Sequence, residues 1–329
     1  MVVKRYAHII GTGSYVPEKI LTNFDLEQMV DTSDEWITTR TGIKRRHIAS
    51  KEVCSSDLSI AASRKAIAAA GIKASDIDLI LLGTVTPDFP VPSTACIVQD
   101  KLGAVNAGVM DIVAACSGFV YGLSLAKAMV EASQYNNVLV IGVETLSKIT
   151  NWEDRNTCVL FGDAAGAAIV HASEKPGGIL GTYLKSDGSL AHLLSITAGG
   201  TRVPIDASNV NNGDRYLKMA GPEVYKNAVR TMTEAAFEVL KRTNLSSADI
   251  DLMISHQANI RIIESTARKI NVPPEKVYIN IQEYGNTSAA SIPLALDEAI
   301  RTGRVKSGDI VLLVAFGGGL TWGSAIVEL

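Results

Sequence analysis

The chain has 329 residues, of which 47% are apolar and 20% charged, and its formal net charge is −3 at pH 7. This length suits a large core and about two domains, and the balanced charge argues against a nucleic-acid-binding protein. The N-terminal MVVKRYAHIIGTG has no apolar core of a secretion signal. Asp111 and Lys127 interrupt the most apolar stretch, 107–130, so a buried strand and helix suit it better than a membrane span. We expect a cytoplasmic protein that binds neither membrane nor nucleic acid.

Helical and strand patterns alternate along the chain. The glycines of GTGS (11–14) follow a strand but lack the third glycine of a dinucleotide-binding loop. Residues 55–71 begin with serines suited to a helix cap and then space apolar residues as a helix does. Residues 78–85, DLILLGTV, are a short apolar run typical of a strand covered on both faces. The same strand pattern occurs in GVMDIV (108–113), NVLVIGVE (137–144) and AAGAAIVHA (164–172).

The second half of the chain repeats the first with a constant offset. DIDL occurs at 76–79 and again at 249–252, and VLVIG from 138 matches VLLVA from 311. The helical stretch that opens at Cys116 matches a second helical stretch at Ala289. The register then breaks, because the first half carries about sixteen extra residues near TLSKITNWEDRNTCVL, and such insertions usually lie at a surface and often carry function. We predict two similar α/β halves, 1–174 and 175–329, with the boundary near ASEKPGG.

The cysteines and histidines show no metal or disulfide pattern. There is no C-x-x-C pair and no H-x-x-x-H pair, whereas disulfide frameworks and zinc sites need patterned spacing. We therefore predict no metal site and a reducing compartment, with structural roles for three of the four cysteines: Cys54, Cys96 and Cys158.

Polar groups stand at the ends of several predicted elements. Cys116 precedes a helix, whose dipole lowers the pKa of a thiol, and it is either a nucleophile or a buried core cysteine. His256, in SHQANIRII, follows a strand at the edge where α/β proteins bind ligands, or it is a capping or core histidine. Asn286, in YGNTSAAS, is a candidate helix cap that the repeat also places near Cys116. The glycines of AFGGGLTWG (315–323) fit a backbone oxyanion donor better than a phosphate loop.

The chain resembles the thiolase superfamily and, within it, the β-ketoacyl-acyl carrier protein synthase III family. The resemblance rests on AACSGF, SHQANIRII, YGNTSAAS and FGGGLTWGSA, with support from DTSDEWITTRTGIKRR and CVLFGDAAGA. It implies a thiolase-like duplicated α/β fold, whose halves are related by a pseudo-twofold axis in α-β-α-β-α layers, and a homodimer. It also implies a catalytic set of Cys116, His256 and Asn286, with oxyanion donors at Cys116 and Gly318. Degradative thiolases have a second cysteine as base, and AFGGGL holds none.

The resemblance implies a decarboxylative Claisen condensation that initiates type II fatty acid biosynthesis. Cys116 would take the acyl group of an acyl-CoA primer, acetyl-CoA by analogy. Malonyl-acyl carrier protein would then lose CO2, and its enolate, held by His256 and Asn286, would attack acyl-Cys116. The products would be 3-oxoacyl-acyl carrier protein, CO2 and CoA, and no metal or redox cofactor is required.

Further site residues follow from the same resemblance. Trp36 and Arg155 would sandwich the adenine of CoA, within a CoA-binding set of Thr32, Trp36, Arg40, Arg155, Asn259 and Phe316. An acidic carrier protein would dock on basic side chains near the entrance, Lys226, Arg261 and Arg268, although a solvated helix face explains these charges equally well.

Primer preference stays open in the sequence. Val91 stands where the family can place a phenylalanine that reaches across the dimer interface to limit the acyl pocket, and Phe89 lies close to it. A branched, longer or polyketide-type primer is therefore an alternative. A 3-hydroxy-3-methylglutaryl-CoA synthase should have a glutamate acid/base near the nucleophile, and the AACSGF neighbourhood offers none. A cysteine hydrolase or a non-catalytic carrier-binding protein are the remaining alternatives.

Overall fold

The first half of the chain forms a five-stranded sheet. The computed structural model describes residues 4–329. The strands lie in the order β1-β7-β6-β4-β5, with bounds β1 Tyr6–Tyr15, β4 Leu79–Gly83, β5 Gly108–Ile112, β6 Asn137–Thr145 and β7 Asp163–Ser173. Strand β4 pairs in parallel with β5 and β6, whereas β7 runs antiparallel to both β6 and β1. The parallel part of the sheet thus ends at one edge, where Cys116 follows β5.

The second half forms a four-stranded sheet of matching topology. Its order is β11-β12-β13-β8, with bounds β8 Ile179–Ser186, β11 Leu252–Ser255, β12 Ile310–Gly317 and β13 Thr321–Glu328. Strands β11 and β12 are parallel, and β13 is antiparallel to both of its neighbours. This repeats the arrangement β4-β6-β7-β1. The predicted halves, 1–174 and 175–329, meet in the segment that joins β7 to β8.

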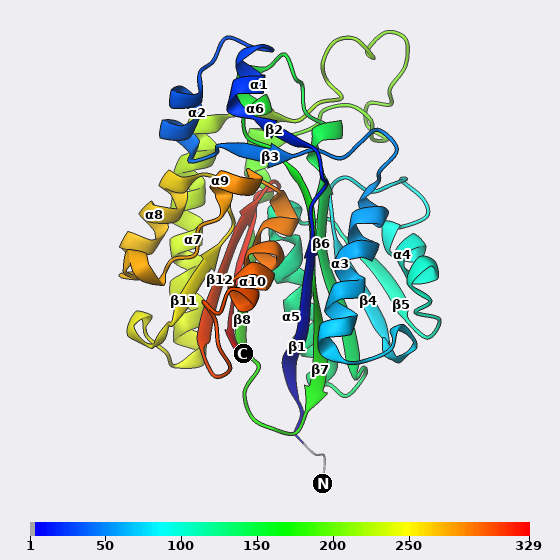
Figure 1. Cartoon of the computed structure of the whole chain (residues 1–329), viewed down its shortest axis with the longest axis vertical. Helices are drawn as coiled ribbons and strands as arrows, with labels where there is room; N and C mark the ends of the chain where they lie inside the picture. The colour runs from blue at the N-terminus through cyan, green and yellow to red at the C-terminus, as the bar shows by residue number, and fades with distance from the viewer. Residues whose placement is uncertain (1–3) are drawn as a thin grey trace.

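The two sheets enclose a shared helical layer (Figure 1). Helices α5 (Gly118–Glu131) and α10 (Ser291–Arg301) lie between the sheets, and the largest core cluster joins them to both. Helices α3 (Ser55–Ala70) and α4 (Thr94–Leu102) cover the outer face of the first sheet. Helices α7 (Gly221–Thr243) and α8 (Ile260–Lys269) cover the second. The predicted α-β-α-β-α layers are confirmed.

Short elements gather above the ends of the sheets, as Figure 1 shows. They are β2 Ile20–Thr22, α1 Asn23–Glu27, α2 Asp34–Thr41, β3 Arg45–His47, α6 Arg155–Cys158, β9 Leu194–Ser195, β10 Lys218–Met219 and α9 Ile281–Tyr284. In the described part of the chain, no helix is long and apolar enough to span a bilayer.

The repeat extends to backbone conformation. The 3-10 turns η2 (Ala115–Ser117) and η7 (Ser288–Ala290) precede α5 and α10, and they contact each other where the halves meet. Ala115 and Ser288 occupy equivalent positions and have φ values of 46° and 49°. Such left-handed backbone costs a non-glycine residue about 1–2 kcal/mol. The packing of the two halves against each other therefore fixes both turns, and with them Cys116.

Two local predictions are wrong in the first half. Helix α3 is capped by Cys54, whose N–H donates to the Asp57 carboxylate at 2.8 Å, and not by a serine. The GTGS segment lies inside β1 and does not follow a strand. A Cβ at Gly11 would lie 2.5 Å from the Ala66 carbonyl oxygen, so this glycine permits α3 to pack directly on β1. Helix packing explains this glycine without any nucleotide.

Two predictions about burial are also corrected. Strand β5 was expected to be buried, but it is the edge of its sheet, and Val113 just beyond it is 81% exposed. The insertion near 145–160 was expected at the surface, and only part of it lies there: Lys148, Glu153 and Asn156 are exposed, whereas its apolar residues Leu146, Cys158 and Val159 are buried. The segment packs against α1 and α2 because its apolar side chains share a core cluster with Leu26 and Ile37.

Candidate active site

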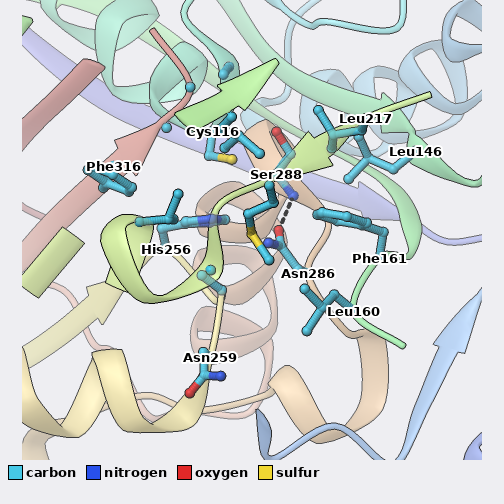
Figure 2. Close-up of a pocket in the computed structure, with 18 of the residues that line it drawn as sticks. Cys116, Leu146, Leu160, Phe161, Leu217, His256, Asn259, Asn286, Ser288 and Phe316 are labelled. Atoms are coloured by element: carbon cyan, nitrogen blue, oxygen red, sulfur yellow. Dashed lines mark hydrogen bonds between the residues drawn. The ribbon is translucent and has the colours of Figure 1, made fainter. Parts of the chain in front are cut away.

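A cavity of about 720 Å³ opens between the two halves. Cys116, His256 and Asn286 all line it (Figure 2). Cys116 lies in η2, His256 directly follows β11, and Asn286 precedes η7. The structure therefore brings the predicted thiol, imidazole and carboxamide to one cavity, with the thiol from one half and the other two groups from the second half.

The thiol of Cys116 is buried in the cavity wall, with the residue 9% exposed. Burial raises the pKa of this thiol to about 12, although the neighbouring Ser288 side chain acts in the opposite direction. The expectation that the helix dipole lowers this pKa is therefore wrong. The free energy lost when a thiolate is moved from water into this site exceeds the free energy gained from its interaction with the first turn of the helix.

The backbone beside Cys116 offers two N–H groups. Cys116 and Gly318 both line the cavity, so their N–H groups are candidate oxyanion donors. A Cβ at Gly317 would lie 2.6 Å from the Cys116 nitrogen, so only glycine lets β12 approach η2 this closely. Sequence reasoning identified the glycine run and Gly318 but missed this role of Gly317. Free N–H groups next to a nucleophile can stabilise an oxyanion.

The imidazole of His256 is held by Ser291. His256 is 2% exposed, and its Nδ1 lies 2.7 Å from the Ser291 hydroxyl oxygen. The Gln257 N–H donates to the same oxygen at 3.4 Å. We assign the Ser291 hydrogen to Nδ1, which places the ring hydrogen of His256 on Nε2. Burial lowers the His256 pKa to about 3, so the ring is neutral at physiological pH.

Asn286 combines the two roles that its sequence left open. Its Oδ1 accepts a hydrogen bond from the Ser288 N–H at 2.9 Å, as a cap does. Its backbone is tied to the other half, because Asn286 N–H donates to Leu160 O at 2.8 Å and Gly162 N–H donates to Asn286 O at 3.0 Å. The Nδ2 group has no acceptor among residues 4–329. A donor in the cavity wall is thus fixed in place.

Glu144 is a functional candidate that sequence reasoning missed. It is the next-to-last residue of the buried strand β6, and it is fully buried. Its carboxylate accepts hydrogen bonds from the Thr86 hydroxyl at 2.6 Å, the Val85 N–H at 3.1 Å and the Ser288 hydroxyl at 3.1 Å. Burial raises the pKa of this carboxyl to about 7. The available signal was a glutamate inside an apolar strand, VLVIGVE.

The predicted CoA-binding residues divide into two groups. Trp36, Arg40, Asn259 and Phe316 line the cavity, whereas Thr32 and Arg155 do not. The Arg155 guanidinium carbon lies 4.3 Å from the centre of the Trp36 ring, in direct contact with the indole. In this structure Arg155 therefore occupies the face of Trp36 on which adenine was expected. The Thr32 hydroxyl is buried without a hydrogen-bond partner.

Asn259 has a clear local role at the cavity rim. Its Oδ1 caps helix α8 by accepting from the Arg261 N–H at 2.9 Å, and its Nδ2 donates to the Arg40 carbonyl at 2.9 Å. Asn259 therefore joins helix α8 to the end of helix α2. Both the oxygen and the nitrogen of its carboxamide therefore have a hydrogen-bond partner within the chain.

The predicted docking side chains lie on the surface near the cavity. Lys226, Arg261 and Arg268 are exposed, and Arg261 also lines the entrance. In the described chain, none of the three forms an ion pair with a carboxylate. Ile263 and Ala267 of the same helix, α8, are buried in the core.

The two predicted acyl-pocket residues do not line the cavity of their own chain. Phe89 is 55% exposed and Val91 is 85% exposed. Beside Cys116 and Ser288 the wall is apolar and includes Leu146, Phe161 and Leu217 (Figure 2). One chain thus supplies an apolar chamber next to the thiol, and Phe89 and Val91 lie outside it.

Solved structures match this fold along almost its whole length. The 3-oxoacyl-(acyl-carrier-protein) synthase III of Aquifex aeolicus VF5 is 50% identical with a TM-score of 0.91, covering 98% of this chain and 100% of that one. The priming β-ketosynthase of the R1128 polyketide pathway is 34% identical with a TM-score of 0.91, covering 99% of this chain and 97% of that one. The doubled fold and the cavity together define a thiolase-like condensing enzyme.

Sequence comparison gives the family. Residues 110–188 match the family model of 3-oxoacyl-(acyl-carrier-protein) synthase III, and residues 240–329 match the model of its C-terminal part. The beta-ketoacyl-(acyl-carrier-protein) synthase III of Caldanaerobacter subterraneus subsp. tengcongensis is 57% identical over 100% of this chain and 99% of its own length. That of Clostridioides difficile is 53% identical over 98% of each. The chain belongs to the β-ketoacyl-acyl carrier protein synthase III family, and it is an acyl-transferring enzyme of the condensation that initiates fatty acid biosynthesis.

Proposed function

We propose that the chain condenses an acyl-CoA primer, acetyl-CoA by preference, with malonyl-acyl carrier protein at Cys116. The observation that carries the proposal is the meeting of Cys116, His256 and Asn286 at one cavity. The products are 3-oxoacyl-acyl carrier protein, CO2 and CoA. Both substrates are thioesters and no electrons are gained or lost overall, so the proposal includes no redox cofactor and no metal.

The first half-reaction transfers the acyl group to sulfur. The Cys116 thiolate attacks the thioester carbonyl, and the tetrahedral oxyanion is stabilised by the N–H groups of Cys116 and Gly318. Collapse of the intermediate expels CoA and leaves acyl-Cys116. The apolar wall that contains Leu146 and Phe161 receives the short acyl chain.

The second half-reaction depends on donors that stay neutral. Loss of CO2 from the malonyl group places negative charge on the thioester oxygen. The Nε2–H of His256 and the Nδ2–H of Asn286 both donate to that oxygen, and neither group introduces a charge that repels it. The enolate carbon then attacks acyl-Cys116 and releases the sulfur as the leaving group.

Reconstitution of the full reaction tests this function. With malonyl-acyl carrier protein and a series of acyl-CoA primers, the expected product is a 3-oxoacyl-acyl carrier protein two carbons longer than the primer, detected by intact mass. Acetyl-CoA is expected to react fastest. Release of free acid from every primer without condensation would contradict the proposal and favour a hydrolase.

A homodimer is part of the proposed functional form. Strand β5 is an exposed sheet edge, and exposed edges invite pairing with another chain. Exposed apolar side chains, Phe89, Val91 and Val113, lie close by in the sequence. Pairing of two β5 edges would cover them and bring Val91 toward the cavity of the other chain.

The carrier protein is proposed to dock through charge. Reversal of Lys226 and Arg268 together, to glutamate, is expected to raise KM for malonyl-acyl carrier protein about tenfold, because rim charges control the association rate. Acylation by acetyl-CoA should stay within about twofold of wild type. Steady-state kinetics with each substrate varied in turn measures both effects.

The matched control for docking is Lys101→Glu. Lys101 is an exposed lysine on α4, on the side of the molecule opposite α8 (Figure 1). This control should leave both KM values unchanged. Lys101→Glu changes the net charge by −2 and the double reversal changes it by −4. A change in log KM for Lys101→Glu half as large as that of the double reversal would therefore mean that overall charge, and not a docking surface, controls KM.

A further inference from the structure

The proposed acylation step leaves the proton of Cys116 without a receiver. Burial holds this thiol protonated. His256 is a poor acceptor of its proton, because burial lowers the His256 pKa to about 3 and because Nε2 carries a hydrogen when Ser291 donates to Nδ1. The amide nitrogen of Asn286 is not a base. The thiol proton must therefore leave by another group.

Ser288 and Glu144 supply a path from the thiol to a buried carboxylate. Ser288 lies beside Cys116 in the cavity wall, where the turns η2 and η7 contact each other. Its hydroxyl donates to Glu144 Oε1 at 3.1 Å, which leaves lone pairs on the hydroxyl oxygen free to accept from the thiol. Figure 2 shows Ser288 between Cys116 and Asn286. Glu144 is close enough to Cys116 for its negative charge to raise the thiol pKa.

We propose that Ser288 and Glu144 form a proton relay that serves acylation, an inference that rests on the proposed function. As Cys116 sulfur bonds to the acyl carbon, its proton passes to the Ser288 oxygen, and the Ser288 hydroxyl proton passes to Glu144. When the bond between the acyl carbon and the CoA sulfur breaks, both transfers reverse and CoA leaves as a thiol. The carboxylate ends as it began, and no co-reactant is consumed.

The protonation equilibrium of Glu144 supports this role. Its pKa, raised by burial to about 7, is near the value at which a general base works best at neutral pH. Its remaining partners, Val85 N–H and the Thr84 and Thr86 hydroxyls, hold it in place and keep it from rotating away from Ser288. Ser288 contacts the reacting sulfur, whereas Glu144 acts through it.

The internal repeat shows that the Ser288 hydroxyl is not a structural necessity. Ala115 is its equivalent in the first half and has nearly the same φ, 46° against 49°. The fold therefore accepts a plain methyl group in this conformation. A Ser288→Ala variant is expected to keep the backbone of η7 and to remove only the hydroxyl.

The test is the rate at which a single acetyl group appears on Cys116 when enzyme is mixed with excess acetyl-CoA, measured by quenched-flow intact mass from pH 5.5 to 9. The wild-type rate should fall as the pH drops below about 7, because a protonated Glu144 cannot accept the proton. Ser288→Ala and Glu144→Gln should both react at least tenfold more slowly at pH 7. Both should also lose the midpoint near pH 7 and show rates that keep rising to pH 9.

Ser147→Ala is the matched control. The Ser147 hydroxyl donates to another buried carboxylate, Asp163, at 2.5 Å, but that pair has no contact with Cys116. This variant should lose stability in thermal unfolding yet keep the wild-type rate and pH midpoint. A wild-type rate and midpoint in Ser288→Ala would overturn the relay, even if Glu144→Gln failed to fold. Failure of the wild-type enzyme to acetylate would instead contradict the proposed function.

Discussion

Replacement of Cys116 with alanine is expected to abolish both acylation and condensation, lowering kcat by about 10⁴-fold or more. The variant lacks the atom that forms the covalent intermediate, and no other side chain in the cavity wall is a comparable nucleophile. Incubation with acetyl-CoA should leave one acetyl group on the wild-type chain and none on Cys116→Ala. Intact mass and peptide mapping measure this directly.

The other cysteines provide the control for this experiment. All four cysteines are free, and Cys96 is exposed, so it is the thiol most accessible to nonspecific acetylation. A Cys96→Ala variant should acetylate and condense as wild type does. Equal acetylation of Cys116→Ala and wild type, or a label mapped to Cys96, would contradict the assignment of Cys116 as the nucleophile.

The architecture could be predicted well from the sequence because the two halves of the chain repeat the same order of strands and helices. The offset that relates the two DIDL segments also relates the 3-10 turns Ala74–Asp76 and Ser247–Asp249, and it relates the start of α5 to that of α10. Each half must bury the same faces of its strands and helices, so the same polar and apolar pattern recurs. Two copies of one pattern are better evidence than either copy alone.

Properties that depend on neighbouring elements were not predictable. The apolar residues of β5 fit a buried strand, but whether a strand has a neighbour on both sides is a property of the sheet. The thiol pKa is a similar case, since the helix start after Cys116 is local whereas burial is set by both halves. The Glu144–Ser288 contact joins residues 144 positions apart in sequence, and no local motif connects them.

The two halves carry different residues at equivalent positions of the repeat, and some of these residues belong to the proposed catalytic site. The repeat relates His256 to Gly83 and Ser291 to Gly118. In the first half these glycines are so close that a Cβ at Gly83 would lie 2.8 Å from the Gly118 carbonyl carbon. In the second half the same place holds the His256–Ser291 hydrogen bond. In the first half, the Gly83 and Gly118 backbones pack closely at this position. In the second half, Ser291 holds the His256 imidazole at the equivalent position.

Removal of the Ser291 hydroxyl is expected to slow only the second half-reaction, as removal of the His256 ring does. Ser291→Ala loses the donor to Nδ1, so the ring can exchange its hydrogen between the two nitrogens and present the wrong one to the cavity. Decarboxylation should fall by about tenfold through this loss of orientation, with acetylation of Cys116 unchanged.

His256→Ala should separate the two half-reactions most clearly. Acetylation of Cys116 should stay within about twofold of wild type, because His256 does not receive the thiol proton. Decarboxylation of malonyl-acyl carrier protein by the acetylated enzyme should fall by about 10²–10³-fold, the usual effect of losing one donor to an oxyanion. The measurement is release of labelled CO2 from isolated acetyl-enzyme.

The pH dependence of that release gives an independent check on the state of the ring. The His256 pKa is lowered to about 3, so the ring gains a proton only below that pH and stays neutral from pH 5 to 9. CO2 release by wild-type acetyl-enzyme should therefore show no midpoint near 6.5, the value of an ordinary histidine. Such a midpoint, or normal decarboxylation by His256→Ala, would mean that the ring is not a neutral donor and that Asn286 and the backbone hold the enolate without it.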